Sequence, residues 1–448
     1  MRRQRPGPGD KRRFSADAAC IYDVGRHGED ALRGHAVRQA AARARRNRRR
    51  PTQARRARSG GGPAPACITP SFRPDGCMQV FECTFTGYRS LRRIRFPLSR
   101  LNVFVGDNGV GKTNLYRALQ LLQAAAAGTL GREIATEGGM ESAAWAGERR
   151  KHERPGIELE VATGERGEYR YAVSIEFAPP QAFAAFGLEP IIKEEHLVFT
   201  GGPRPETVME RTNHRAWARD EVGTKHDVAD DLLPSETALA AVRDASRFPD
   251  ADLVRRTLLQ WRFYHSFRTD AGSPLRQPCL AVTTPMLSSD GSDLAALFAT
   301  LKHIREDTVD LDATITDAFP GARLVVPPPD RTASFGMIYE EFPQRVFDAS
   351  ELSDGTLRFL ALAGALLGYR LPPFLALNEP ETSLHPDHLP ALARLLARAA
   401  QRSQVWIVTH SRDLATALEN AGGTRPLTVI KRKGETWIQG LTLASELR

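Results

Sequence analysis

The feature that most constrains the fold is a glycine-rich loop between a short apolar segment and a long helical pattern. Residues 106–113 read GDNGVGKT. The fixed positions of the pattern G-x-x-x-x-G-K-[ST] are filled by Gly106, Gly111, Lys112 and Thr113. The apolar run 101–105 before the loop predicts a buried strand, and the leucine spacing in 113–127 predicts a helix. A strand, a glycine loop and a helix in this order predict a phosphate-binding loop.

The chemistry of such a loop depends on its backbone and on two side chains. Glycines let backbone N–H groups converge on phosphate oxygens, and the helix N-terminus adds a partial positive charge. Lys112 is placed to reach the β and γ phosphates, and the Thr113 hydroxyl is placed to bind Mg²⁺. The simpler alternative is a glycine turn at a strand end, so the choice depends on the sequence further along the chain.

Helical and strand patterns alternate after residue 350, which predicts a parallel sheet flanked by helices. The helical segments are 355–368, 389–401 and 412–420, and the strand segments are 373–379, 404–410, 426–433 and 437–443. Earlier in the chain, 79–85 predicts a strand, and 157–163 and 169–177 predict a hairpin. Residues from about 180 to 320 predict a mostly helical lobe, after which 322–328 and 333–341 return to strand.

Three segments after residue 350 place polar groups where a ligand-binding sheet needs them. Asn378 and Glu379 follow an apolar strand, at the carboxyl edge where doubly wound sheets bind ligands. A carboxylate there can polarise a water for attack on a γ-phosphate. His410 ends another apolar strand, and Ser353 opens a long helix within the turn SDG. Each also has a simpler interpretation: a surface glutamate, a structural histidine and a helix N-cap.

The motifs GDNGVGKT, LSDGT, LALNEPE and VTHS occur in this order. The chain thereby resembles the ABC-type ATPase heads of the SMC and RecF-like group, and more narrowly the bacterial stand-alone AAA-type core-domain ATPases related to RecF. FTGYRSL before the loop and LSSDGSDLAAL at 287–297 are also similar to that group. The resemblance covers most of 78–448 and none of 1–77. It implies an α/β P-loop NTPase fold, with a mixed or parallel sheet flanked by helices and an inserted, mostly helical lobe.

The resemblance also implies roles for single residues. The nucleotide-binding loop would comprise Gly106, Asp107, Asn108, Gly109, Val110, Gly111, Lys112 and Thr113, with Asn114 beside it. Glu379 would be the catalytic base, with Lys112 acting on the phosphates and His410 sensing the γ-phosphate. Ser353 and Gly355 would form a signature motif that contacts ATP bound to the other subunit of a dimer. The D-loop at the dimer seam would contain Ser383, Leu384 and His385.

The sequence departs from the pattern of that group at Asn378. The group usually has an aspartate there, which holds a Mg²⁺-bound water. Asparagine keeps an acceptor oxygen but lacks the charge, so we expect Thr113 and Asn378 to hold the metal weakly and ATP hydrolysis to be slow. The glutamine of the group's Q-loop has only a weak candidate, Gln181.

The excess positive charge is confined to the start of the chain. The net charge is +9, and residues 1–77 hold 19 Lys and Arg against 6 Asp and Glu, leaving 43 basic and 47 acidic residues elsewhere. Residues 1–77 are poor in apolar side chains and predict a disordered extension. This extension is a phosphate-contacting arm, a solvated tail, or translated upstream sequence with the natural start at Met78. In the last two cases residues 78–448 would suffice for an ATPase domain.

Other observations exclude classes of protein. No run of about 18 apolar residues is present, so no membrane span is expected. No apolar signal segment begins the chain. The five cysteines contain no C-x-x-C pair, which fits a reduced, cytoplasmic protein. The predicted helical lobe argues against a transporter subunit, and the LSDGT and VTHS segments argue against a P-loop kinase.

Two functions therefore stay open. The first is a Mg²⁺-dependent ATPase that closes as an ATP-sandwiched homodimer and acts on double-stranded DNA, in double-strand break repair or genome maintenance. The alternative is a nucleotide-gated switch or sensor in a defence system, acting through a protein partner. One cluster is either a DNA contact or only a solvated hairpin, and it comprises Arg89, Arg92, Arg93 and Arg95.

Overall fold

A computed structural model describes residues 78–148, 151, 155–178, 186–228, 232–306 and 308–441. Backbone contacts group Cys77–Arg448 into one compact unit. The predicted disorder of 1–77 and the weak candidate Gln181 fall outside the described residues. Within those residues, no helix is long and apolar enough to cross a membrane.

The first sheet has six strands, in the order β10 (Arg262–Tyr264), β16 (Phe374–Asn378), β17 (Gln404–Thr409), β3 (Leu101–Val105), β18 (Leu427–Arg432) and β19 (Glu435–Ile438). The first five strands run parallel, and β19 pairs antiparallel with β18. Every residue of β17 is buried, which is why the sequence there is a continuous apolar run rather than an alternating one. The polar ends of β16 and β17 consequently meet at one edge of this sheet.

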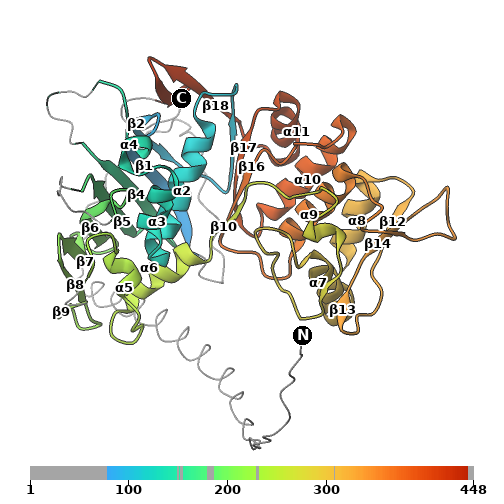
Figure 1. The fold of residues 1–448 in the computed structure, drawn as a ribbon, viewed down its shortest axis with the longest axis horizontal. Helices are drawn as coiled ribbons and strands as arrows, with labels where there is room; N and C mark the ends of the chain where they lie inside the picture. Colours follow the sequence, from blue (N-terminus) through green and yellow to red (C-terminus); the bar gives the residue numbers. More distant parts are fainter. Residues whose placement is uncertain are drawn as a thin grey trace, which may run out of the picture. The chain divides into compact units, whose positions relative to one another are not determined.

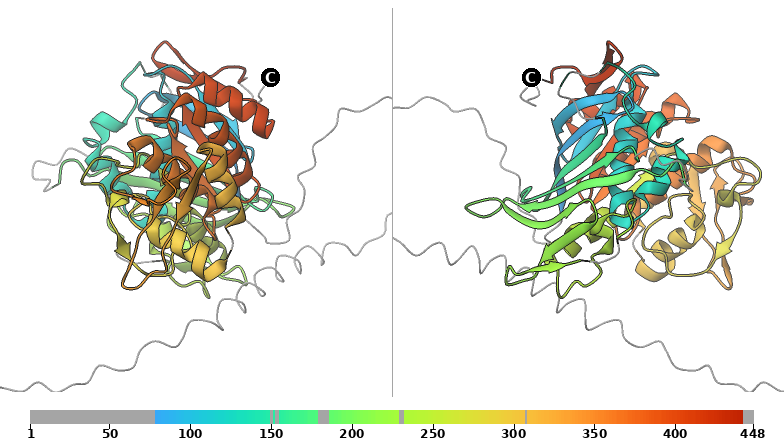
Figure 2. Two further views of the ribbon diagram at one scale, coloured as in Figure 1. Left: turned by 90° about the vertical axis from the view of Figure 1, so that its right-hand side faces the viewer. Right: turned by 60° about the vertical axis from the view of Figure 1, so that its left-hand side comes forward.

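The second sheet has eight antiparallel strands, seen side by side in blue to green in Figure 2. Their order is β2 (Leu91–Pro97), β1 (Gln79–Tyr88), β4 (Ile157–Gly164), β5 (Tyr169–Glu176), β6 (Ile191–Phe199), β7 (Glu206–Thr212), β8 (Arg215–Arg219) and β9 (Lys225–Asp227). Buried residues alternate strictly along β5, so the sheet has one packed face.

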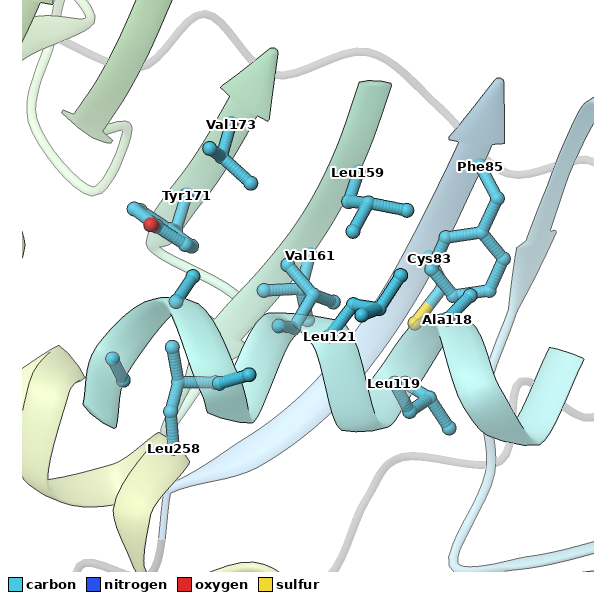
Figure 3. Packing of buried hydrophobic residues seen from close by; sticks show 14 of the residues in the cluster. Cys83, Phe85, Ala118, Leu119, Leu121, Leu159, Val161, Tyr171, Val173 and Leu258 are labelled. Carbon is cyan, nitrogen blue, oxygen red and sulfur yellow. The ribbon is translucent and has the colours of Figure 1, made fainter. Parts of the chain in front are cut away.

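Helix α2 (Lys112–Ala127) contacts strands of both sheets. Figure 3 shows side chains of β4, among them Leu159 and Val161, packed against α2 in the same buried cluster. The cluster continues to the first sheet, where the rings of Phe104 and Trp406 stack at 4.1 Å between centroids. The helix that follows the glycine loop is therefore held in place by buried contacts with both sheets.

A second buried cluster supports the other face of the six-stranded sheet and includes α9 (Asp354–Leu367), α10 (Leu389–Ala399) and α11 (Arg412–Gly422). Figure 1 labels most of the remaining elements. The helices are α3 (Leu130–Thr136), α4 (Met140–Ala143), α5 (Ala238–Ala241), α6 (Pro249–Leu259), α7 (Leu294–Ala299) and α8 (Val309–Ala318). Two 3₁₀ helices, η1 (Pro274–Arg276) and η3 (Pro386–His388), and one π-helix, η2 (Thr300–Arg305), are also present in the described residues. Short strands are β11 (Cys279–Leu280), β12 (Ala322–Val325), β13 (Thr332–Ala333), β14 (Gly336–Tyr339) and β15 (Phe347–Asp348).

The predicted α/β class with helices around a mainly parallel sheet is confirmed. One part of the predicted helical lobe is wrong, because β6, β7, β8 and β9 between 191 and 227 extend the second sheet. Glu195 in β6 obscured the strand pattern, because its carboxylate is fully buried. Its oxygens accept hydrogen bonds from the backbone N–H groups of Ala238 and Leu239 and from the hydroxyl of Tyr171. A buried charge satisfied by distant groups leaves no local signature.

Candidate nucleotide-binding site

The glycine loop lies between the end of β3 and the start of α2. Gly109 and Gly111 have φ values of 80° and 97°, in the left-handed region that favours glycine. A Cβ on Gly106 would lie 2.5 Å from the carbonyl oxygen of Val429, and one on Gly111 would lie 1.9 Å from Oγ1 of Thr436. Gly111 is the N-cap of α2 and offers no side-chain acceptor. The first N–H groups of the helix are therefore left for an acceptor from outside, such as a phosphate.

A chain of hydrogen bonds from Asn114 through two hydroxyl groups supports the backbone of the loop. Nδ2 of Asn114 donates to Oγ of Ser90 at 2.6 Å, and the hydroxyls of Ser90 and Thr436 lie 2.6 Å apart. Oγ1 of Thr436 donates to the carbonyl oxygen of Val110 at 2.8 Å. Asn114 thus supports the loop from its far side. Ser90 and Thr436 were not among the predicted site residues, although Ser90 lies within the FTGYRSL segment.

The side chain of Lys112 folds back into the loop, and Lys112 is only 4 % exposed to solvent. Its Nζ donates to the carbonyl oxygens of Gly106 at 2.6 Å and Asp107 at 3.0 Å. Burial lowers the pKa of Lys112, while the carboxylates of Glu379 and Glu381 raise it. The ammonium group therefore lies in the electrostatic field of two carboxylates, both in the segment that follows β16.

Glu379 and His410 meet at the carboxyl edge of β16 and β17. Nδ1 of His410 lies 3.0 Å from Oε2 of Glu379 and 3.2 Å from Oε1 of Glu381. The N–H of Glu379 donates to the carbonyl oxygen of Val408 at 2.7 Å, which continues the parallel pairing past the end of β16. One imidazole thus bridges two carboxylates beside the lysine of the loop.

Glu381, the second carboxylate of the segment NEPE, was not among the predicted site residues. Glu381 is only 7 % exposed to solvent. Its Oε1 accepts a hydrogen bond from the Thr409 hydroxyl at 2.5 Å, and further hydrogen bonds from the backbone N–H groups of His410 and Ser411 at 3.2 and 3.3 Å. The only sequence feature that could have indicated Glu381 was the presence of a second glutamate two residues after Glu379. Glu381 fixes the turn after β17 and thereby the position of His410.

Asn378, at the end of β16, has a buried Oδ1 that no other described group engages through a hydrogen bond. Thr113 is exposed at the start of α2. Mg²⁺ in nucleotide sites takes a few protein oxygens together with waters and phosphate oxygens. The unpartnered amide oxygen of Asn378 and the hydroxyl of the exposed Thr113 are oxygen donors of this kind, so the two residue types fit a Mg²⁺ ion.

His265 also lies at this edge, one residue beyond β10. Tyr264 pairs with Leu377, so His265 stands beside Asn378 in the next strand. The imidazole lies 5.9 Å from the ring of Tyr116 on α2. Burial lowers the pKa of His265, Arg117 lowers it further, and Glu379 raises it. His265 could not be predicted as a site residue, because the preceding segment WRFY fits the helical pattern of α6 and gives no sign of a strand.

Ser353 and Gly355 lie at the start of α9. Oγ of Ser353 accepts from the N–H of Thr356 at 3.1 Å, which is an N-cap. Among the described residues, no hydrogen bond or ion pair connects Ser353 or Gly355 to the loop 106–113. In the segment 383–385, which the resemblance predicts as a D-loop, His385 is exposed and Ser383 has a φ of 65°. The structure thus places His410 against Glu379 and Lys112 in the field of that carboxylate, whereas Ser353 and Gly355 make no hydrogen bond or ion pair with the described loop 106–113.

The family description "AAA domain, putative AbiEii toxin, Type IV TA system" matches residues 101–415, from the first residue of β3 into α11. The chain belongs to this AAA-domain family. Its match spans the glycine loop, the strand ending in Asn378 and the strand ending before His410. The AAA-domain assignment agrees with the observed P-loop ATPase fold, while the narrower RecF-related group expected from the motifs is not established by it.

Three solved structures are similar to this AAA-domain protein at low identity. Two are Smc heads, one bound to the C-winged helix domain of ScpA and one, from Pyrococcus furiosus, with an extended coiled coil and bound to the C-terminal domain of ScpA. Each is 14 % identical with a TM-score of 0.43, covering 82 % of this chain and 99 % or 97 % of its own. The SMC head domain from Thermotoga maritima is 16 % identical with a TM-score of 0.37, covering 80 % and 98 %. No curated protein matches the sequence.

Proposed function

We propose that this protein binds Mg·ATP and hydrolyses it to ADP and phosphate. The observation that carries the proposal is the Glu379 carboxylate at the sheet edge, held by His410 and acting electrostatically on Lys112. In the proposed reaction a water oxygen bonds to the γ-phosphorus while the bond from that phosphorus to the β–γ bridging oxygen breaks. The water's proton passes to Glu379, and ADP leaves.

The residues of the loop would bind and orient the triphosphate. Backbone N–H groups at the start of α2 would bind phosphate oxygens, and Lys112 would exchange its two carbonyl acceptors for phosphate oxygens. Mg²⁺, held by Thr113 and Asn378, would supply positive charge to the β and γ oxygens. His410 would hold the carboxylate of Glu379 in place and contact the γ-phosphate. Because Asn378 is neutral, we propose weak metal binding and slow turnover.

We further propose that two copies of the chain close around two ATP molecules. Support comes from the signature turn, which in the described part of the chain shares no hydrogen bond or ion pair with the loop 106–113. A two-fold arrangement would bring Ser353 and Gly355 of one subunit to the ATP of the other, twice, in a closed pair. ATP would then form part of the interface, and hydrolysis would release it.

The proposal of action on duplex DNA, in repair or genome maintenance, rests on the order of the motifs alone. The arginines of the β1–β2 hairpin lend it little support, because three of them already have carboxylate partners. Arg89 lies 2.8 Å from Glu137, Arg92 lies 2.7 Å from Glu435, and Arg95 lies 2.9 Å from Glu82. A pull-down with nuclease treatment separates the possibilities: protected DNA supports this proposal, and a protein partner supports the sensor alternative.

The test of the ATPase proposal is phosphate release by the purified full chain and by Glu379→Gln. The variant keeps the shape of the side chain but cannot accept the proton, so turnover should fall at least a hundredfold while ATP binding persists. Glu341→Gln, in the exposed loop after β14, is the matched control and should hydrolyse ATP at the parent rate. If Glu379→Gln hydrolyses ATP as fast as the parent, another residue is the base.

A further inference from the structure

The first two turns of α9 contact the loop 379–385 at two separate points. A Cβ on Gly355 would lie 2.9 Å from the carbonyl oxygen of Ser383, so only glycine permits this close approach. One turn further along α9, Nη2 of Arg358 donates to the carbonyl oxygen of Glu379 at 3.1 Å. The same short piece of helix thus carries the signature turn at its start and a direct contact to the proposed catalytic residue.

Arg358 is an unusual residue for its position. It is only 7 % exposed, on a helix whose neighbouring side chains are apolar, and its Nε is buried with no acceptor among the described residues. Burial lowers the pKa of its guanidinium, and the carboxylates of Glu381 and Glu379 raise it. An arginine is rarely buried unless its charge has partners. Its hydrogen-bond partner here is the carbonyl oxygen of Glu379, and its charge is stabilised electrostatically by the carboxylates of Glu381 and Glu379.

The backbone that Arg358 contacts is held in a conformation that needs support. Glu379 has a φ of 48°, a left-handed value uncommon for a residue with a side chain. Its N–H donates to the carbonyl oxygen of Val408, and its own carbonyl oxygen accepts from Arg358 and from the N–H of Thr382. Because the peptide groups on both sides of its Cα are fixed, the direction in which the Glu379 carboxylate leaves the chain is fixed as well.

We propose that Arg358 is a positioning residue that couples the signature turn to Glu379 of the same subunit. The inference rests on the proposed function, in which Ser353 meets the ATP of a second subunit. Seating of the signature turn then moves the start of α9, and with it the Arg358 guanidinium and the carbonyl of Glu379. Binding of ATP in the second subunit thereby changes the position of Glu379 in the first subunit. Arg358 acts on turnover without contacting nucleotide.

The experiment compares Arg358→Met, Arg358→Lys and Arg211→Met in the full chain. Methionine fills similar volume without a donor, and lysine restores a single donor for the Glu379 carbonyl. Arg211 in β7 is the matched control, because it is fully buried and donates to the carbonyl oxygens of Asn213 and Leu233 at 2.8 and 3.0 Å, away from the loop 379–385. The readouts are kcat and KM for ATP, ATP affinity by calorimetry, and the melting temperature.

Arg358→Met should lower kcat about tenfold or more, because small displacements of a catalytic group have effects of this size. Its ATP affinity should stay within about twofold of the parent, and in combination with Glu379→Gln its ATP-dependent dimer should persist, since neither property passes through Glu379. Arg358→Lys should recover several-fold of the lost kcat. Arg211→Met should lower the melting temperature while leaving kcat unchanged.

Parent-level kcat in Arg358→Met would overturn the coupling and leave the ATPase assignment intact. A loss of ATP affinity of tenfold or more would also overturn it, because Arg358 would then serve the fold or the nucleotide. Equal activity of the lysine and methionine variants counts against it too. A different result would be that the unmutated protein hydrolyses ATP no faster than Lys112→Ala. That result would overturn the proposed ATPase function, and the proposed role of Arg358 with it.

Discussion

Nδ1 of His410 lies 3.0 Å from Oε2 of Glu379, where the parallel strands β17 and β16 end side by side. The same nitrogen lies 3.2 Å from Oε1 of Glu381, whose position is set by three donors in the turn after β17. The buried carboxylate of Glu381 therefore orients the imidazole, and the imidazole in turn orients the more exposed carboxylate of Glu379. This arrangement leaves Glu379 as the carboxylate available to a water.

Lys112→Ala should weaken ATP binding roughly 10- to 100-fold, since hydrogen bonds to a charged group are each worth about 1.5–3 kcal/mol. Isothermal calorimetry on the full chain measures the change. Lys193→Ala is the matched control, because Lys193 pairs with Glu176 on the antiparallel sheet and should bind ATP as the parent does. Equal affinity of Lys112→Ala and the parent would mean that the loop is not a phosphate site.

Asn378→Asp should lower the Mg²⁺ concentration needed for half-maximal hydrolysis, by roughly tenfold, because a carboxylate oxygen attracts the cation more strongly than an amide oxygen. The measurement is a Mg²⁺ titration of the rate at saturating ATP. Asn420→Asp, exposed near the end of α11, adds the same charge away from the site and should leave the titration unchanged. A flat response in both variants would show that Asn378 does not face the metal.

Glu379→Gln with saturating Mg·ATP should form a stable dimer, because ATP binds but is not removed. Without nucleotide the same variant should be a monomer. Ser353→Arg should prevent dimerisation through steric overlap at the signature turn while retaining ATP binding by the monomer. Light scattering after size-exclusion chromatography measures the mass of each species. A Glu379→Gln protein that stays monomeric under saturation points to a heterologous partner in place of a second copy.

Thr436→Val should lower the free energy of unfolding by about 1–2 kcal/mol, because it leaves the Ser90 hydroxyl and the Val110 carbonyl without their shared partner. Thr436 is 2 % exposed, so water does not easily replace the lost group. Urea denaturation gives the stability, and calorimetry should show weaker ATP binding because the glycine loop loses its brace. Thr332→Val, on the exposed side of β13, controls for the loss of a hydroxyl. Unchanged stability and affinity in Thr436→Val would show that the brace is dispensable.

His265 should make the protein less stable at acidic pH. Burial and Arg117 lower its pKa below the ordinary value of 6.5, while Glu379 opposes them and Arg358 acts with them. The folded chain therefore binds fewer protons than the unfolded chain as pH falls through about 6.5, and stability declines in that window. His265→Asn should reduce the decline in urea midpoint between pH 7.5 and 5. His214→Asn, in an exposed turn, should keep the parent's pH dependence, and an identical slope in His265→Asn would contradict the assignment.

Local patterns were sufficient for several elements. The loop 106–113 and the strand and helix beside it were predictable because glycine positions, an apolar run and leucine spacing are properties of neighbouring residues. The same holds for the alternation after residue 350, where β16, α10, β17 and α11 occur as the periodicity predicts. The hairpin of β4 and β5 followed from its short polar turn. These features depend on contacts within a few residues of one another.

Sequence by itself determined that this chain carries a strand–loop–helix able to bind phosphate and, far downstream, strands that end in Asn378, Glu379 and His410. Only the tertiary structure decided that β16 and β17 are adjacent and in register, so that His410 meets Glu379. It likewise placed His265 beside Asn378 and Arg358 against the Glu379 carbonyl. The physical reason is that strand order and the partners of buried charges are set by packing between segments far apart in the chain, which leaves no periodic trace in either segment.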